Sequence, residues 1–129
     1  MPTARGTFET HDWQGESWFS AEGIGLGAAS LRKTFAGDLD GTSQVRILTG
    51  TDEGAPLTYV GLEIVDGTLA GLRGSFVLQH ATEPTDTTSV LTRVVPGSGR
   101  GELAGITGSL RIVLTPEGGH EYVLEHELA

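Results

Sequence analysis

The sequence predicts an all-β protein, a closed eight-stranded antiparallel β-barrel formed by residues 1–129 as one domain. Segments rich in β-branched and aromatic residues alternate between apolar and polar positions, as strands do. The chain has 20 glycines in 129 residues without a collagen-like period, which suits a β protein with many tight turns. No segment shows the 3.6-residue apolar period of a helix. Eight strands with short connections favour a barrel or a sandwich, and closure removes exposed sheet edges.

Taken in order, the predicted strands cover 5–13, 26–36, 42–50, 57–65, 68–81, 88–95, 108–115 and 119–128. Clusters of Gly, Pro, Asp and Glu mark the turns between them, at 37–41, 52–54, 66–67, 84–86, 96–99 and 117–119. A short helical turn is expected near 101–107. A Gly-x-Leu-x-Gly pattern recurs at 37–41, 67–71 and 101–105. We interpret it as glycine that lets strands bend sharply and pack closely at barrel corners.

Composition excludes several classes of function. The formal net charge is -9 and the pI is near 4.7, so nucleic acid and anionic membrane surfaces are poor partners. The chain has no cysteine, which excludes disulfides, thiol catalysis and zinc–thiolate sites. No signal peptide is visible after Met1, and no apolar run approaches the ~20 residues that span a bilayer. We expect a soluble cytoplasmic protein.

The central hairpin is the most informative segment. Asp66-Gly67 lies between two apolar runs and predicts a two-residue turn, which pairs Val65 with Thr68 and Glu63 with Ala70. Neither face of this hairpin is polar, so both are expected to be covered. One face then carries Tyr59, Glu63, Phe76, Leu78 and His80, and the other carries Val60, Leu62, Ile64, Leu69 and Val77.

Glu63, His80 and Tyr59 are the candidate catalytic residues. A carboxylate rarely faces an apolar interior without a partner, and burial would raise the pKa of Glu63 toward that of a general acid or base. The imidazole of His80 can exchange a proton near neutral pH. The alternatives are an outward Glu63, either paired with Arg73 or simply solvated, and a histidine at the barrel rim that is hydrogen-bonded to backbone.

The last strand alternates clearly, and Glu121, Glu125 and Glu127 mark its water side. His120 and Tyr122 are therefore expected to point inward, where Tyr122 can hold a ligand oxygen or simply pack in the core. The candidate ligand-binding residues are Trp13, Phe76, Leu78, Glu102, His120 and Tyr122. For Glu102 a surface role is the stronger interpretation.

No metal site is predicted. His120 and His126 share a strand face but lie about 20 Å apart at ~3.3 Å per residue, too far for one ion. His80, His120 and Glu63 can converge only if their strands pack around one end of the barrel. No cofactor is expected either, and the nucleophile-elbow motif of hydrolases is absent from the sequence.

Several motifs together resemble one family of small bacterial proteins, DUF3224. They are YVGLE at 59–63, GSFVLQH at 74–80, VVPGSG at 94–99, GEL at 101–103 and GHEY at 119–122. The resemblance implies an eight-stranded antiparallel barrel similar to plant allene oxide cyclase and dirigent proteins. Those proteins bind hydrophobic small molecules inside the barrel, steer cyclisation or coupling, and tend to form oligomers. The family has no settled activity, so the resemblance informs fold more than function.

Two functions therefore stand side by side. One is a cofactor-independent cyclase or isomerase that holds a hydrophobic small molecule in a reactive shape, with Glu63 as acid or base and Tyr59, Tyr122 and His80 positioning oxygens. The other is a non-catalytic carrier that uses the same pocket. A third hypothesis is a filled barrel whose role lies in a homo-oligomeric surface bearing Val60, Leu62 and Ile64.

Overall fold

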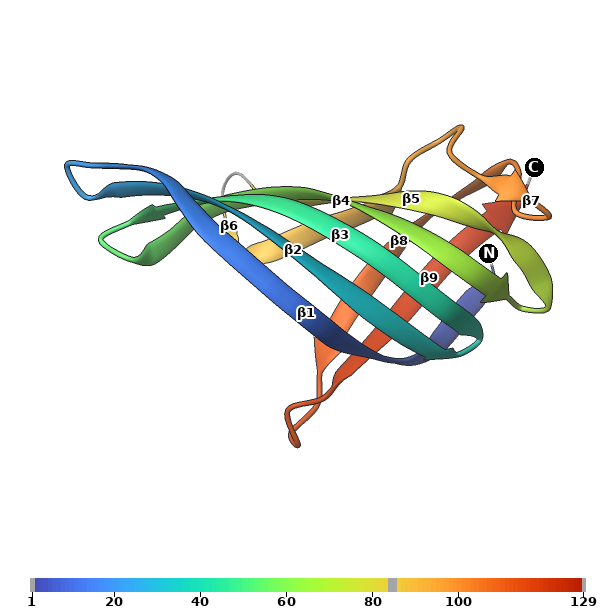
Figure 1. Cartoon of the computed structure of the whole chain (residues 1–129). Helices are drawn as coiled ribbons and strands as arrows, with labels where there is room; N and C mark the ends of the chain where they lie inside the picture. The colour runs from blue at the N-terminus through green and yellow to red at the C-terminus, as the bar shows by residue number, and fades with distance from the viewer. Residues whose placement is uncertain (1, 84–85, 129) are drawn as a thin grey trace.

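The computed structural model describes residues 2–83 and 86–128, and strands dominate this part of the chain. All elements in Figure 1 are strands, and none of the described residues forms a helix. No membrane-spanning helix therefore exists among them. The strands are β1 (Thr3–Ala21), β2 (Ile24–Gly37), β3 (Leu39–Asp52), β4 (Ala55–Leu69), β5 (Leu72–Glu83), β6 (Asp86–Val94), β7 (Arg100–Gly101), β8 (Ile106–Leu114) and β9 (His120–Leu128).

The sheet closes on itself through eight strands. Its order is β4-β3-β2-β1-β9-β8-β6-β5, and β5 pairs again with β4, so the eight long strands form a ring. Every pairing is antiparallel. The predicted all-β class and antiparallel pairing are confirmed. Two-residue β7, which the sequence did not predict, is added to the edge of β5.

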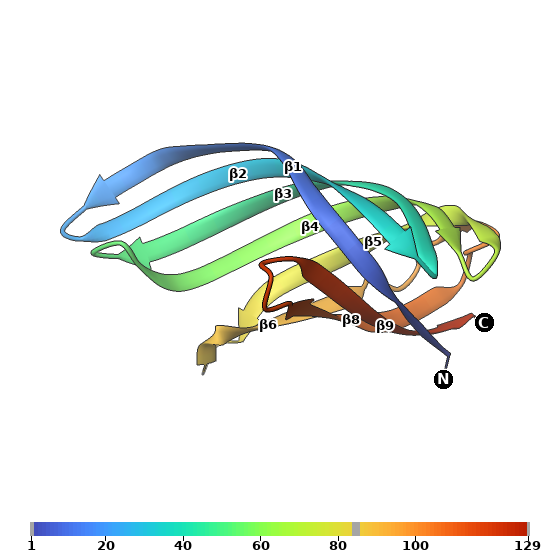
Figure 2. The same cartoon turned by 90° about the horizontal axis from the view of Figure 1, so that it is seen from below.

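The ring has a packed end and an extended end. At the packed end, near both termini, the core includes Phe35, Leu39, Leu69, Phe76 and Leu124. At the other end the β1–β2 and β3–β4 hairpins extend beyond the remaining strands (Figures 1 and 2). Figure 2 shows β1 to β4 as one curved layer above β5, β6, β8 and β9. The two ends of the ring therefore differ: core side chains fill one end, and the two long hairpins extend past the other.

The central hairpin turns four residues later than predicted. Strand β4 continues through Asp66 and Gly67, and the turn is Ala70-Gly71, with φ values of 49° and 86°. These left-handed values fit the two-residue turns of β-hairpins. The predicted pairing of Glu63 with Ala70 is thus wrong, because Glu63 lies opposite Leu78. The offset is an even number of residues, so it keeps Glu63 on the same face as Phe76, Leu78 and His80.

Gly67 lies inside the sheet because neighbouring backbones approach it closely. It pairs with Gly41 on one side and Gly74 on the other. A Cβ on Gly67 would overlap the carbonyl oxygen of Asp40. The three leucines of the Gly-x-Leu-x-Gly pattern, Leu39, Leu69 and Leu103, are all buried at the packed end. The pattern therefore marks a corner where strands bend and the core closes.

The outer face of the hairpin is exposed. Val60, Leu62 and Ile64 are 48 %, 56 % and 43 % exposed, so no described part of the single chain covers this face. The sequence also predicts Leu69 on that face, but Leu69 belongs to β4 rather than β5 and points into the core. The segment 102–105, where a short helical turn is expected, forms successive turns between β7 and β8 with hydrogen bonds three residues apart. The predicted turn at 84–86 includes residues 84–85, which lie outside the described residues.

Candidate functional site

Five polar side chains meet inside the ring, and we call them the Glu63 network. Glu63 lies at its centre and is fully buried. Its Oε1 accepts hydrogen bonds from Lys33 Nζ at 3.2 Å and from His80 Nε2 at 2.7 Å. Its Oε2 accepts one from Ser43 Oγ at 2.5 Å. His80 Nδ1 lies 3.1 Å from Thr92 Oγ1. All five side chains are buried, so water contributes little to their interactions.

Strand register explains why these residues meet. Lys33 on β2 pairs directly with Ser43 on β3, and His80 on β5 pairs directly with Thr92 on β6. Glu63 on β4 lies diagonally between the two pairs, opposite Val45 and Leu78. Direct and diagonal neighbours on one sheet face are within reach of long side chains. Five consecutive strands of the ring thus place one polar residue each at the same level.

The partners of Glu63 set its charge. Burial is the strongest single influence and raises the pKa of the Glu63 carboxyl. The hydrogen bond from His80, the positive charge of Lys33 and the hydrogen bond from Ser43 together outweigh it, so the pKa lies below its ordinary value of 4.5. The predicted rise is wrong because it considered burial without partners. Glu63 is therefore a carboxylate at neutral pH, and it serves as acceptor and counter-ion.

The carboxylate also fixes the hydrogen positions around it. An ionised carboxylate only accepts, so His80 Nε2 must carry a hydrogen. His80 Nδ1 then either accepts from the Thr92 hydroxyl or, in the charged imidazole, donates to it. Lys33 Nζ has three N–H donors and also lies 4.6 Å from the ring centroid of Phe8. One bond to Glu63 and one cation–π contact leave Lys33 with donor capacity for a further molecule.

A cavity of about 410 Å³ opens beside the Glu63 network. Lys33 and His80 contribute to its wall, together with Tyr59. The other lining residues are apolar, small or hydroxyl-bearing: Leu31, Val45, Ile47, Thr49, Gly50, Thr51, Pro56, Thr58, Thr82 and Ile112. Most lie toward the extended ends of β3 and β4. An apolar chamber with a few polar groups at one point is the usual form of a small-molecule site, and this volume is in the usual range.

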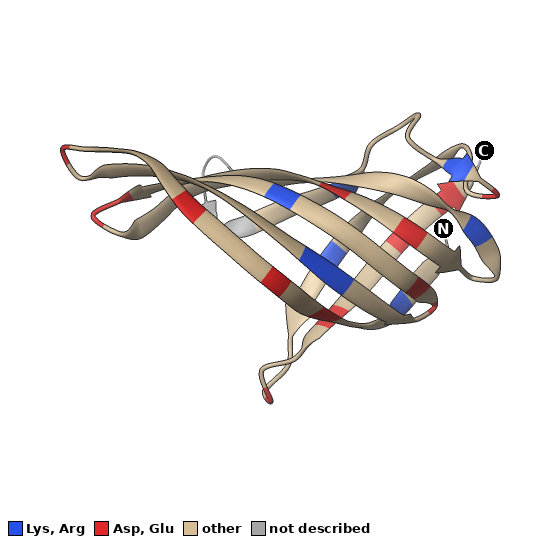
Figure 3. Ribbon diagram, in the orientation of Figure 1, with Lys and Arg blue, Asp and Glu red and all other residues tan. Residues whose placement is uncertain are grey.

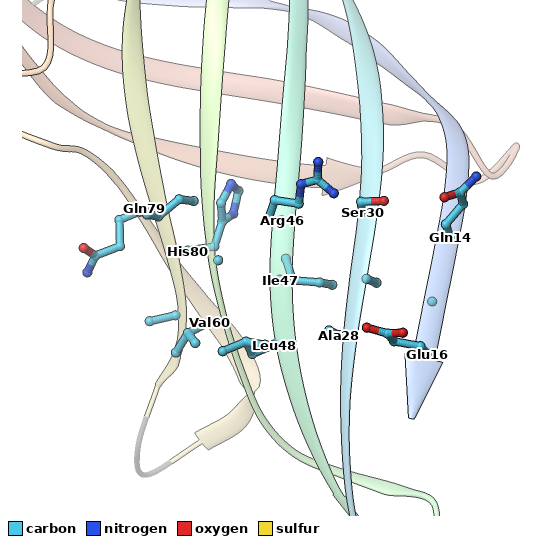
Figure 4. Close-up of a pocket in the computed structure, with 15 residues that line it drawn as sticks. Gln14, Glu16, Ala28, Ser30, Arg46, Ile47, Leu48, Val60, Gln79 and His80 are labelled. Atoms are coloured by element: carbon cyan, nitrogen blue, oxygen red, sulfur yellow. The ribbon is translucent and has the colours of Figure 1, made fainter. Parts of the chain in front are cut away.

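A second, larger hollow of about 790 Å³ crosses β1 to β5 (Figure 4). We call it the outer groove, because most of its side chains point away from Glu63. They form two cross-strand rows, Gln14-Ser30-Arg46-Leu62-Gln79 and Glu16-Ala28-Leu48-Val60-Ala81. Leu48 and Leu62 are more than half exposed. Of the Glu63 network only His80 also contributes to the wall of this groove, whereas Lys33 and His80 both line the interior cavity, so we assign the candidate site to the interior cavity.

The predicted catalytic residues come together. His80 contacts Glu63, and Tyr59 lines the same cavity. Burial and the nearby charge of Glu63 raise the pKa of the Tyr59 phenol, which therefore stays neutral as a hydrogen-bond donor. The alternative pairing of Glu63 with Arg73 is not what the structure shows. Arg73 instead forms a surface ion pair with Asp66, at 2.7 Å.

The predicted ligand-binding residues scatter. Phe76 and Leu78 are fully buried in the core and line neither described cavity. Trp13 is 64 % exposed on β1. Glu102 is exposed, and its Oε1 accepts a hydrogen bond from the backbone of Arg73.

The two inward residues of β9 differ in their surroundings. The ring of His120 stacks on the ring of Phe8, with 4.9 Å between the ring centroids, and Lys33 Nζ lies over the Phe8 ring. Phe8 therefore separates His120 from the Glu63 network. Tyr122 is fully buried. Its hydroxyl contacts the backbone of Ala36 and Leu39, which is the core-packing alternative stated for this residue.

Sequence reasoning missed Lys33, Ser43 and Thr92. A signal for Lys33 was present, because it alternates with Leu31 and Phe35 on one face of its strand. A charged residue in an apolar row points to a buried partner. Ser43 and Thr92 carry no comparable signal, because hydroxyl residues are common on both faces of strands.

Charges outside the network are dispersed. Figure 3 shows acidic and basic segments interspersed over strands and turns. Among residues 2–83 and 86–128, no group of three or more His, Cys, Asp or Glu side chains is arranged to hold a metal ion. The Lys33–Glu63 pair is buried, in contrast to the exposed pairs Arg32–Asp12 and Arg73–Asp66.

Comparisons with known proteins identify relatives without identifying an activity. The family described as "Protein of unknown function (DUF3224)" matches residues 4–126. A crystal structure of a DUF3224 protein with unknown function from Shewanella oneidensis MR-1 is similar over the full length. It is 34 % identical with a TM-score of 0.89, and the match covers 100 % of this chain and 98 % of that one. No curated protein sequence matches significantly.

Proposed function

The chain belongs to the DUF3224 family, and we propose that it is a cofactor-independent isomerase or cyclase acting on a hydrophobic small molecule in its interior cavity. In this proposal the closed ring works as a barrel of the allene oxide cyclase kind. The observation that carries the proposal is the buried Glu63 network at the wall of an otherwise largely apolar cavity. Removing two opposite charges from water costs free energy that their mutual attraction often does not recover. A role in function explains why the buried Lys33–Glu63 ion pair is present.

The network offers distinct chemical roles. Lys33 can donate a hydrogen bond to a carbonyl or hydroxyl oxygen of the ligand and stabilise negative charge that develops there. His80 can take a proton from one carbon through Nδ1, once the Thr92 hydroxyl turns away, and return it to another. Glu63 holds both groups in place as the counter-ion. Because the proton is returned, such an isomerisation consumes no oxidant, reductant or cofactor.

The first experiment is native mass spectrometry of the purified protein, followed by denaturing analysis of any released compound. The proposal expects an apolar molecule of a few hundred daltons. That compound is then incubated with fresh protein, and its isomers are separated by chromatography. Conversion should fall strongly in His80→Asn and in Glu63→Gln, while His11→Gln should match wild type because the bond of His11 to Thr34 lies at the surface. Unchanged conversion in both network variants would overturn these roles.

A carrier that binds without reaction is the second candidate. It is favoured by one observation: both ring nitrogens of His80 are already engaged, by Glu63 and Thr92. For a carrier, the recovered compound comes back unchanged from wild type, and Glu63→Gln alters only its affinity. The same incubation therefore separates the two candidates.

A further inference from the structure

We propose that Lys33 forms a protonated imine with an apolar aldehyde or ketone bound in the interior cavity. This inference rests on the proposed function, because it assigns a substrate class to the same cavity. It starts from an unusual fact of the sequence: Lys33 is the only lysine in the chain. That single primary amine among the side chains is 7 % exposed and lies inside a closed sheet.

The position of Lys33 suits reaction with a carbonyl compound. Lys33 lines a cavity with apolar walls that include Leu31 and Val45. Imines hydrolyse in water, and a buried amine in an apolar chamber protects them. Desolvated lysines are the ones that form Schiff bases with carbonyl substrates. An ordinary surface lysine has none of these features.

The charges around Lys33 suit the product. In the reaction the carbonyl carbon gains a bond to Nζ and loses its oxygen as water. Two of the three ammonium hydrogens leave with that water, and one stays on nitrogen. The positive charge is unchanged, so the protonated imine can keep the 3.2 Å hydrogen bond from Nζ to Glu63 Oε1. Any reaction that removed the charge would leave Glu63 buried without its counter-ion.

A protonated imine would also serve the proposed isomerisation. It withdraws electrons from neighbouring C–H bonds. In a ligand with a C=C bond next to the acidic C–H bond, loss of a proton to His80 gives a neutral dienamine, and the positive charge passes to the His80 imidazolium, which stays hydrogen-bonded to Glu63. Return of the proton at another carbon, followed by addition of water, releases the rearranged carbonyl compound and restores the Lys33 ammonium. His80 and Lys33 are hydrogen-bonded to the same carboxylate oxygen, Oε1 of Glu63, and both residues line the cavity.

The test is reductive trapping with 4-(dimethylamino)cinnamaldehyde and sodium cyanoborohydride, read by intact mass and peptide mapping. We expect one adduct on Lys33, accompanied before reduction by the red-shifted absorption of a protonated imine. The adduct should vanish in Lys33→Arg, which keeps the charge. Lys33→Arg with Arg46→Lys supplies an exposed lysine in the outer groove as a control for ordinary lysine reactivity. It should trap far more slowly than wild type.

Methyl NMR of the same mixture separates failure of this inference from failure of the proposed function. Val45 and Ile112 report on the interior cavity alone, and Leu48 and Val60 report on the outer groove. Interior shifts without an adduct on Lys33 would overturn the imine and leave the cavity proposal standing. Neither interior shifts nor an adduct would overturn both. Labelling confined to the α-amino group, or equal in the surface-lysine control, would also overturn the imine.

Discussion

Glu63 shows how partners decide the behaviour of a buried acid. Its carboxylate is fully buried, yet three hydrogen bonds, one of them within the ion pair with Lys33, hold it in the charged form. The stability of the buried carboxylate depends on these partners, because removing one member of a buried ion pair leaves the other charge uncompensated. At the scale of the single residue, the Glu63 network therefore contributes to the stability of the fold as well as to the chemistry of the site.

Glu63→Gln is expected to lower the free energy of unfolding by about 3 kcal/mol at pH 7, because Lys33 loses its buried counter-ion. The matched control is Asp66→Asn, which breaks the exposed pair with Arg73 and should cost less than about 1 kcal/mol. Urea unfolding of the three proteins measures both values. Equal effects for the two variants would contradict a stabilising buried pair.

The pH dependence of this variant follows from the lowered pKa of Glu63. A carboxyl whose pKa is lowered on folding stabilises the protein above its unfolded pKa, near 4.5, and loses that contribution as pH falls through the folded pKa. The glutamine amide of the variant cannot titrate. The stability difference between wild type and Glu63→Gln should therefore shrink as pH falls below about 4.5. A difference that grows in acid would show that the pKa is raised instead.

Protonation of His126 should destabilise the folded protein. It is buried, and no partner for its Nδ1 exists among the described residues. Burial lowers the pKa of His126 below 6.5, so the unfolded chain takes up a proton that the folded chain resists. Stability is thus lost as pH falls below 6.5. His126→Leu should raise the melting temperature more at pH 5.5 than at pH 8, and an equal change at both would contradict this account.

At the scale of elements, the close backbone approach at Gly67 underlies one prediction and explains why the hairpin turn was misplaced. Gly67→Ala would drive a Cβ into the Asp40 carbonyl, a backbone group that cannot move away cheaply. We expect a loss of about 1–3 kcal/mol. Gly15→Ala is the control, since its nearest neighbour is the exposed side chain of Trp13. Thermal unfolding compares the two, and a neutral Gly67→Ala would show that strands β3 and β4 can separate there.

The same elements show what the sequence can predict. Alternation located all eight long strands, because it depends only on one face being buried. It did not locate the hairpin turn, since Asp66-Gly67 and Ala70-Gly71 are both acceptable as turns locally. The choice depends on Gly67 lying between Gly41 and Gly74, a contact between strands that local pattern does not contain. The assignment of Glu63, Phe76, Leu78 and His80 to one face of the hairpin remains correct, because the pairing of β4 with β5 is shifted by an even number of residues.

The alternation of apolar and polar residues along the strands also predicted part of the candidate site. Glu63 and His80 stood out as polar residues within apolar rows, and the structure brings them to 2.7 Å. Lys33, Ser43 and Thr92 come from three other strands, so their meeting depends on the register of the whole ring. Trp13, which the sequence suggested as a pocket residue, is exposed on the part of β1 beyond its pairing with β9.

At the scale of the whole molecule, the exposed apolar side chains of β3 and β4 indicate an interaction surface. Leu48, Val60, Leu62 and Ile64 are each more than two-fifths exposed on one face. Exposed apolar patches of this kind mark sites where other molecules bind, and we expect a second copy of the chain there. Sedimentation at micromolar concentration should show a homo-oligomer that Leu62→Glu dissociates. A monomeric wild type would contradict this expectation.

The central claim is that the interior cavity beside the Glu63 network is the ligand site. It is tested most directly by a methyl NMR titration with 1-anilinonaphthalene-8-sulfonate, which combines an apolar ring system with one anionic group. The account predicts shifts at Val45 and Ile112, weakened in Lys33→Met because the anion loses its ammonium partner. Shifts confined to Leu48, Val60 and Leu62 in the outer groove, with the interior methyl signals unmoved, would contradict it.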